Sequence, residues 1–315
     1  MQVAIIGASG AIGRSVAEAY HRAGERVRLV GRQAVPLEAL ASTGDEVVTA
    51  DVSTLAGCRA AVAGMDAAVY SFGLPYSDRA FAAYPEMMQH FLAAVRGAGL
   101  KRVLLITNIY AYGMAQSAQV AEDHPRVPCS VKGEWRKRQE DIFLAASGNG
   151  PECISLRLPD FYGPRVATSM LYGVAKAAAA GRTGLLLSPA DQPHEFGFTP
   201  DVGPVVRDLL RHQGAVAGPY NLAGAGVISL RGLAELMYQA AGRPPRLRVL
   251  PVWQQSLLGL VVPALREIAT MRYLLKHPVL LDDSKLRTLL PGLRKTSYAD
   301  GARATVAAAG KTKAS

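Results

Sequence analysis

Three glycines near the start of the sequence have the spacing of a phosphate-binding turn. Gly7, Gly10 and Gly13 follow an apolar run at residues 3–6 and lead into an amphipathic stretch. In such a turn the first glycine permits the tight bend, the second lets the backbone approach a pyrophosphate, and the third allows close helix–strand packing. The N–H groups and the positive dipole end of the following helix would then meet the phosphates. The pattern predicts a dinucleotide site.

The end of the second predicted strand bears on which dinucleotide binds. NAD-specific folds usually have an acidic residue there, which accepts hydrogen bonds from the ribose hydroxyls. Here the strand ends in Arg32, which can pair bidentately with a 2′-phosphate, and Arg14 beside the last loop glycine adds a second cation. We therefore expect NADP(H) to be favoured over NAD(H). The alternative is that Arg32 is an ordinary solvated arginine.

Short β-rich runs alternate with helical stretches along the first half of the chain. Such alternation predicts βαβ crossovers and an α/β fold with a Rossmann-type, doubly wound parallel sheet. Strands are expected at residues 3–6, 27–30, 46–50, 67–71, 102–107, 153–158 and 220–222. Helices are expected between them at residues 12–23, 36–40, 55–63, 80–97 and 133–146.

The remaining segments fit this alternation less well. They carry predicted helices at residues 168–180, 230–241 and 253–275, joined by proline-rich linkers. We predict a dinucleotide-binding domain from residues 1–164 and about 201–223. A smaller, mostly helical substrate-binding lobe would come from about 165–200 and 224–315.

Several motifs together resemble the short-chain dehydrogenase/reductase superfamily, in particular its extended branch of NAD-dependent epimerases and dehydratases. The glycine spacing G-x-x-G-x-x-G is the first. The others are VLLITNIYAYG at 103–113, LRLPDFYGP at 156–164, EFGFTPDV at 195–202 and YNLAG at 220–224. Their order and spacing extend the resemblance over nearly the whole chain. It implies an oxidoreductase or epimerase acting on a small carbonyl, hydroxyl or sugar-like substrate held between two lobes.

The resemblance also implies which residues contact the cofactor. They are Gly7, Ser9, Gly10, Ala11, Ile12, Gly13, Arg32, Asp51, Phe72, Arg136 and Pro159. Asp51, after the third strand, matches the aspartate that contacts adenine in the family. Arg136 stands where the family has the lysine that holds the ribose.

The Tyr-x-x-x-Lys pair that supplies the family's acid/base chemistry is missing. Aligned by the following glutamate and leucine, Lys132 takes the place of the tyrosine and Arg136 that of the lysine. The family's serine or threonine, which bonds the substrate oxygen, falls near Thr107 and Asn108. These two residues are therefore the expected contacts of the substrate oxygen.

Three interpretations of the missing tyrosine stay open. Lys132 is itself the proton donor, with its charged form disfavoured by burial and by Arg136. A loop tyrosine, Tyr112 above all but also Tyr110 or Tyr162, replaces the phenol. The site does no redox chemistry, and the protein is a non-catalytic NADP(H)-binding redox sensor or scaffold. The structural alternative for Lys132 is a solvated lysine at a helix start.

Composition excludes several other classes of protein. Half of the residues are hydrophobic and 19% are charged, which is typical of a globular chain. Three cysteines without metal-ligand spacing favour a reducing cytoplasm and predict neither a disulfide framework nor a metal site. The net charge of +10 is scattered and accompanies no nucleic-acid-binding motif. We expect a small-molecule substrate as partner and no nucleic acid; a homodimer is compatible with the sequence.

The most apolar later stretch, residues 257–265, is too short to span a bilayer, which takes about 20 residues. We therefore expect no membrane span, and no signal peptide is visible at the N-terminus. The stretch predicts a buried or groove-lining helix, with a role at a membrane surface as the alternative.

Overall fold

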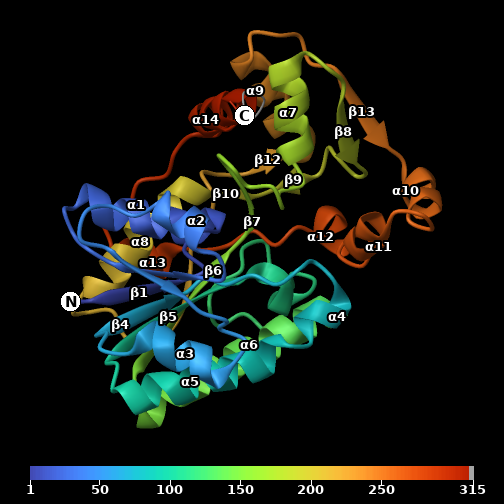
Figure 1. Cartoon of the computed structure of the whole chain (residues 1–315). Coiled ribbons are helices and arrows are strands. Elements are labelled where there is room, and N and C mark those ends of the chain that lie inside the picture. The colour runs from blue at the N-terminus through green and yellow to red at the C-terminus, as the bar shows by residue number, and fades with distance from the viewer. Residues whose placement is uncertain (312–315) are drawn as a thin grey trace.

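The computed structural model describes residues 1–311 and is built around a parallel sheet of seven strands (Figure 1). The strands lie in the order β11-β6-β5-β4-β1-β2-β3. Their bounds are β1 Val3–Ile6, β2 Arg28–Gly31, β3 Glu46–Thr49, β4 Ala67–Tyr70, β5 Arg102–Asn108, β6 Glu152–Leu158 and β11 Gly218–Asn221. This doubly wound order confirms the predicted Rossmann-type α/β fold.

Helices cover both faces of the sheet, which explains why the central strands β1 and β4 are buried along their whole length. In β1, Val3 and Ile5 pack into one hydrophobic cluster, and Ala4 and Ile6 pack into the other. The first cluster includes side chains of α1 (Ala11–Arg22), α2 (Ala34–Glu38) and α8 (Thr199–Arg211). The second includes side chains of α3 (Leu55–Val62), α5 (Tyr84–Ala98) and α6 (Val131–Ala145).

Two predicted helices are broken, and in each a proline begins a new helix. The helix expected at 80–97 is divided into α4 (Asp78–Phe81) and α5, with Pro85 in the first turn of α5. The helix expected at 253–275 becomes α10 (Val252–Leu258), α11 (Pro263–Ala269) and α12 (Tyr273–Lys276). Proline lacks an N–H and clashes with the preceding turn, so it is accommodated at a helix start and not inside.

A second, smaller lobe stands apart from the sheet, at the top of Figure 1. Its hydrophobic cluster joins α7 (Tyr172–Ala180), α9 (Leu230–Ala240) and α14 (Tyr298–Lys311). Three short strand pairs complete it and link it to the large domain: β8 (Gly184–Leu187) with β13 (Leu247–Leu250), β9 (Pro193–His194) with β12 (Ile228–Ser229), and β7 (Asp160–Tyr162) with β10 (Phe196–Phe198).

The C-terminal segment 224–315, predicted to belong to the small lobe, contributes to both cores. Leu286 of α13 (Ser284–Leu289) and the following Leu290 pack into the cluster beside α1 and α8. Residues 312–315 of this segment lie outside the described residues.

The apolar stretch 257–265 is not the buried helix that its composition predicts. Leu257, Leu260 and Val261 are 61%, 80% and 77% exposed. No helix within residues 1–311 is long and apolar enough to cross a bilayer.

Candidate functional site

The loop after β1 has a geometry that only glycine permits at two positions. Gly7 has φ +82°, in the left-handed region, and a Cβ there would lie 3.0 Å from the backbone of Phe72. At Gly13 a Cβ would lie 2.2 Å from the Gly7 carbonyl oxygen, so α1 packs directly on the loop. The N–H of Gly10 donates to the same oxygen at 3.0 Å. The loop is thus a closed turn held against the helix start.

The N-terminus of α1 is open to an anion. Gly10 is the N-cap residue, no side chain caps the helix, and the first turn holds no acidic residue. Ser9 and Gly10 are exposed, and Ala11 and Ile12 are half-buried. The first-turn N–H groups and the positive end of the helix dipole therefore face outward. This cradle fits the pyrophosphate of a dinucleotide.

Two guanidinium groups add positive charge near this cradle. Burial and the neighbouring Arg165 lower the pKa of Arg14, which follows Gly13 in α1. Arg165 itself has φ +63°, an unusual backbone conformation for a residue other than glycine. Two mutually repelling cations beside a helix N-terminus favour a phosphate ligand.

Three of the predicted cofactor contacts gather at the carboxyl ends of β2, β3 and β4. The exposed Arg32 lies over the ring of Phe72, with its Cζ 5.8 Å from the ring centroid. Hydrogen bonds from the side chain and backbone of Ser53, with the Arg32 charge as a smaller cause, lower the pKa of Asp51. In doubly wound sheets, ligands bind at these strand ends. The arrangement fits the adenosine end of a dinucleotide.

Lys132 is buried, as one of the predictions has it, but the groups around its ammonium are not the expected ones. Its side chain is fully buried, and its Nζ contacts Asp78 Oδ1 at 2.7 Å and Glu267 Oε2 at 2.5 Å. It also donates to Thr270 Oγ1 at 3.1 Å and lies 5.0 Å from the centroid of the Tyr76 ring. Two carboxylates contact the ammonium, whereas the sequence predicts the cation of Arg136 as its charged neighbour. The alternative prediction of a solvated lysine is therefore wrong, and the two carboxylates were not predicted as neighbours of Lys132.

Arg136 is also buried, but it points to the end of β5. It donates to Gln139 Oε1 at 2.7 Å and to the Ile106 carbonyl at 3.1 Å, and its Cζ lies 4.7 Å from the centroid of the Tyr84 ring. Its Nε and the Oγ1 of Thr107 are both buried without a partner among the described residues. Such orphaned atoms call for a partner outside the chain, such as water or a ligand. Arg136 and Thr107 thus fit a polar ligand group at this strand end.

Tyr112, the loop tyrosine predicted to be catalytic, is part of a buried structural network. Arg157 donates to its hydroxyl oxygen at 2.7 Å, and the hydroxyl donates to Asn221 Oδ1 at 3.1 Å. Arg157 is paired in turn with the buried Glu140 at 2.8 Å. Tyr162, another loop candidate, is buried against Phe198. The Tyr112 hydroxyl is thus occupied within the chain, whereas the Tyr162 hydroxyl is buried without a partner among the described residues.

Tyr110 is placed differently and belongs to a group of residues that are far apart in the sequence. Tyr76, Tyr110, Asp160 and Tyr273 come from four separate segments. Burial, followed by the charges of Tyr76 and Asp160, raises the pKa of Tyr110 well above its usual value. His194 Nε2 lies 3.0 Å from Asp160 Oδ2.

The signals for this cluster were weak. Asp160 directly follows Pro159 in the LRLPDFYGP motif and could have been found there. No sequence motif indicates that Tyr76 and Tyr273 lie near each other, because 196 residues separate them in the sequence.

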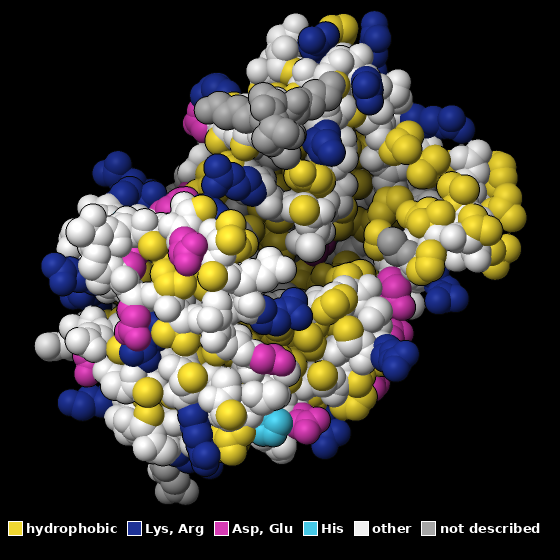
Figure 2. Space-filling view, viewed as in Figure 1, with side chains coloured by type: hydrophobic (Ala, Val, Ile, Leu, Met, Phe, Trp, Pro, Cys, Tyr) yellow, Lys and Arg dark blue, Asp and Glu magenta, His cyan; other side chains and the backbone are white. Residues whose placement is uncertain are grey.

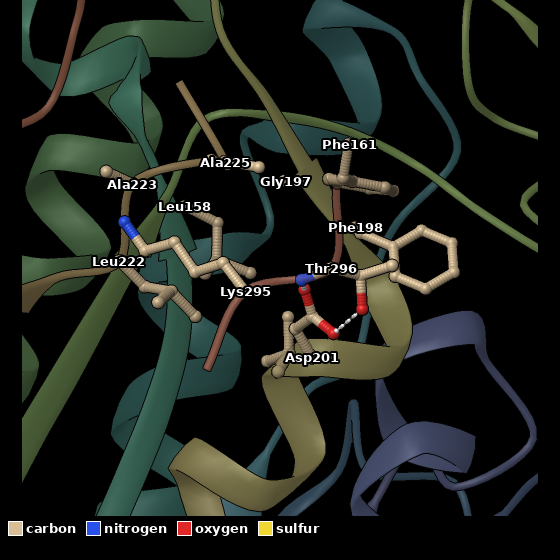
Figure 3. Close-up of a pocket in the computed structure, with 12 residues that line it drawn as sticks. Leu158, Phe161, Gly197, Phe198, Asp201, Leu222, Ala223, Ala225, Lys295 and Thr296 are labelled. Atoms are coloured by element: carbon tan, nitrogen blue, oxygen red, sulfur yellow. Dashed lines mark hydrogen bonds between the residues drawn. The ribbon is translucent and has the colours of Figure 1, made fainter. Parts of the chain in front are cut away.

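A separate pocket opens beside the start of α8, near the ends of β6 and β11 (Figure 3). Asp201 accepts hydrogen bonds there from the backbone and the side chain of Thr296, at 2.8 and 2.7 Å. Burial raises the pKa of Asp201. The other residues that line this pocket include Leu158, Phe161, Phe198, Leu222 and Lys295. The bound Asp201 therefore anchors the C-terminal segment to the large domain.

The comparison with family models agrees with the loop geometry. Residues 7–148 match the model described as NAD(P)H-binding. This part of the chain is an NAD(P)H-binding domain. No curated protein sequence matches the chain.

Solved structures resemble the NAD(P)H-binding domain and the small lobe together. UDP-glucuronic acid 4-epimerase from Bacillus cereus, in complex with NAD, has 16% identity and a TM-score of 0.80, with 99% of each chain covered. UDP-glucose 4-epimerase from Thermus thermophilus, also with NAD, has 18% identity and a TM-score of 0.78, covering 98% of this chain and 99% of that one. The Thermotoga maritima UDP-glucose 4-epimerase, with UDP-glucose, has 15% identity and a TM-score of 0.80, covering 99% and 100%. The chain therefore has the fold of the extended short-chain dehydrogenases, as the sequence motifs indicate.

Proposed function

We propose that the protein is an NADP(H)-dependent reductase of a small carbonyl or keto-sugar-like substrate, held between the NAD(P)H-binding domain and the small lobe. The open N-terminus of α1 behind Gly7 and Gly10 carries the proposal. A bound dinucleotide supplies the hydride from its nicotinamide ring. Side chains of the protein would bind the substrate oxygen and supply the proton.

Arg32 supports the preference for NADP(H). Its guanidinium lies over Phe72 and is exposed at the carboxyl end of β2, where its N–H groups can meet a 2′-phosphate. Asp51, the nearest carboxylate in this group, follows β3 and is hydrogen-bonded to Ser53 at 3.0 and 2.7 Å. At the end of β2, Arg32 thus stands where an NAD-specific fold has an acidic residue that accepts hydrogen bonds from the ribose hydroxyls.

Asn108 and Tyr110 support the handling of the substrate oxygen. The Oδ1 of Asn108 accepts the Tyr110 N–H at 3.2 Å, which leaves the amide N–H groups as donors toward a substrate. The Tyr110 phenol, with its raised pKa, stays protonated at neutral pH. As a protonated phenol it can donate a hydrogen bond to a substrate oxygen.

Titration of the purified protein with NADPH and with NADH tests the cofactor. NADPH should bind at least ~10-fold more tightly, equivalent to about 1.4 kcal/mol. Equal curves for the two dinucleotides would contradict the preference. Binding of neither would contradict the function as a whole.

A panel of small carbonyl compounds and UDP-keto-sugars tests the reaction through NADPH consumption. Tyr110→Phe should slow turnover by roughly 10²–10⁴-fold and leave NADPH affinity nearly unchanged. Tyr112→Phe is the matched control, because its hydroxyl is bound to Arg157 and Asn221. Slow turnover in the Tyr112 variant with a fast Tyr110 variant would reverse the assignment.

A non-catalytic NADP(H) sensor or scaffold is the second candidate. The observation that favours it is Lys132, which replaces the family's tyrosine and is enclosed by Asp78 and Glu267. In that case NADPH would bind normally, no compound of the panel would be consumed, and Tyr110→Phe would change nothing.

A further inference from the structure

One corner of the molecule exposes a continuous group of large apolar side chains. It is formed by α10 and the loop that joins it to α11, and is called the apolar tip below. Figure 2 shows these side chains gathered at the right, over α10 and α11, beside the hollow between the two lobes. Its exposed members are Val252, Trp253, Leu257, Leu258, Leu260, Val261 and Val262.

Helix α10 has its polar and apolar sides reversed relative to an ordinary surface helix. Gln255 is buried, only 4% exposed, and its Nε2 donates to the Leu250 carbonyl at 2.7 Å. Trp253 and Leu257 are 65% and 61% exposed. A surface helix of a globular protein buries its apolar side and exposes its polar one. The reversal indicates that the outer side of α10 contacts an apolar medium or partner.

The chain around the tip is strongly basic. Residues 243–277 contain one acidic residue, Glu267. The same segment holds the basic residues Arg243, Arg246, Arg248, Arg266, Arg272 and Lys276. Glu267 is neutralised by its ion pair with Lys132. The basic side chains, of which all but Arg272 are exposed, therefore leave this end of the lobe positively charged.

We propose that the apolar tip docks on the surface of an anionic lipid bilayer. An exposed tryptophan with leucines and valines, flanked by arginines, is the composition that enters the boundary between headgroups and acyl chains. The arginines meet anionic headgroups while the apolar side chains are buried among acyl chains. A second copy of this chain is a poorer occupant, because a two-fold contact would bring two sets of the same positive charges together.

The tip is attached to the rim of the cleft. Glu267, on α11, contacts Lys132 and also accepts the Asp78 N–H at 3.1 Å. These contacts join α11 to α4 and α6 of the large domain. Docking would thus hold the rim of the cleft next to the lipid surface.

Co-sedimentation of the full chain with vesicles tests the proposal. The protein should bind vesicles containing about one-third phosphatidylglycerol and bind phosphatidylcholine vesicles at least ~10-fold more weakly, and added salt should weaken the binding. The double variant L260E/V261E should lose at least ~10-fold in vesicle affinity. Val227→Glu is the matched control, since Val227 is an exposed valine (59%) outside the tip.

Three outcomes would overturn the proposal. The native protein does not bind the anionic vesicles, or L260E/V261E binds them as well as the Val227 control does. Alternatively, light scattering shows a dimer that L260E/V261E dissociates, in which case the tip joins two copies. NADPH titration of L260E/V261E checks its folding independently, because the tip lies apart from the glycine loop.

Discussion

Lys132 on α6 and Glu267 on α11 are joined by an ion pair of 2.5 Å, although 135 positions separate them in the sequence. Asp78 is the second carboxylate on this ammonium, at 2.7 Å. The ion pair also connects the exposed apolar tip with the large domain. Lys132, one of the predicted proton donors, thus links α6 of the large domain to the C-terminal segment that carries α11.

Substitutions at Gly10 and Gly13 should have different effects, one on dinucleotide binding and the other on stability. A Cβ at Gly10 meets only the Gly7 carbonyl oxygen at 3.2 Å, and its φ of −71° suits any residue. Gly10→Val should therefore fold and lose dinucleotide binding, because the branched side chain fills the space of the pyrophosphate. Gly13→Ala would place its Cβ 2.2 Å from the same oxygen, so it should lower the free energy of unfolding.

Thermal unfolding and NADPH titration of both variants distinguish the two effects. A folded Gly10→Val protein with native NADPH affinity would show that the dinucleotide does not bind at this loop.

Arg32→Asp should reverse or abolish the preference for NADPH. The change removes the cation over Phe72 and supplies the carboxylate that ribose hydroxyls bind in NAD-specific folds. NADPH affinity should fall by at least ~10-fold, while NADH affinity holds or rises. Competition titrations measure both, with Arg26→Asp as a control for the general effect of charge. An equal loss of NADPH affinity in the two variants would mean that Arg32 does not bind the 2′-phosphate.

The sequence predicted those parts of the fold whose signals are local. Each sheet strand was found to within two residues, and the central strands β1 and β4, which are buried on both faces, read as short apolar runs. The glycine loop was found because Gly7, Gly10 and Gly13 lie in one turn. Pro263, which begins α11, was overlooked as a helix boundary in the long apolar stretch.

The contacts of the site could not be predicted in the same way. Lys132 depends on Asp78 and Glu267, which are 54 and 135 positions away. The exposure of Leu260 could not be predicted either. An apolar run indicates burial on average, and only the packing of α10, with Gln255 turned inward, exposes it.

Glu195 should make stability depend on pH near neutrality. Burial raises its pKa to about 7, although the N–H groups of Leu281 and Gly224 donate to it. Its usual pKa is 4.5, so the unfolded chain releases the proton first as pH rises. The stabilising contribution is complete below about pH 4.5, falls between 4.5 and 7, and is lost above 7. Its full size is on the order of 3 kcal/mol.

Denaturant unfolding at several pH values measures this dependence. Glu195→Gln should flatten the slope between pH 5 and 7, whereas Glu235→Gln on α9 should leave it unchanged. Parallel curves for the native protein and both variants would show that Glu195 does not titrate there.

Lys132→Met should cost stability and spare cofactor binding. It removes a fully buried ammonium and leaves Asp78 and Glu267 without their cation. Breaking a buried pair costs about 3–5 kcal/mol, but these carboxylates are 37% and 20% exposed and keep part of their hydration, so about 2 kcal/mol is expected. Lys137→Met, which breaks a surface pair with Asp141, should cost less than about 0.5 kcal/mol.

Urea unfolding of the two variants, with NADPH titration and turnover of any substrate found, separates a structural lysine from a catalytic one. If Lys132 is structural, the Lys132→Met variant has a lower unfolding midpoint than the native protein. Its turnover per folded molecule stays close to native, since Tyr110 gives the proton. The contrary result is a Lys132→Met protein of native stability and NADPH affinity whose turnover falls by roughly 10²-fold or more. Lys132 would then be the proton donor despite its two carboxylates, and Glu267 would have to move away from it during the reaction.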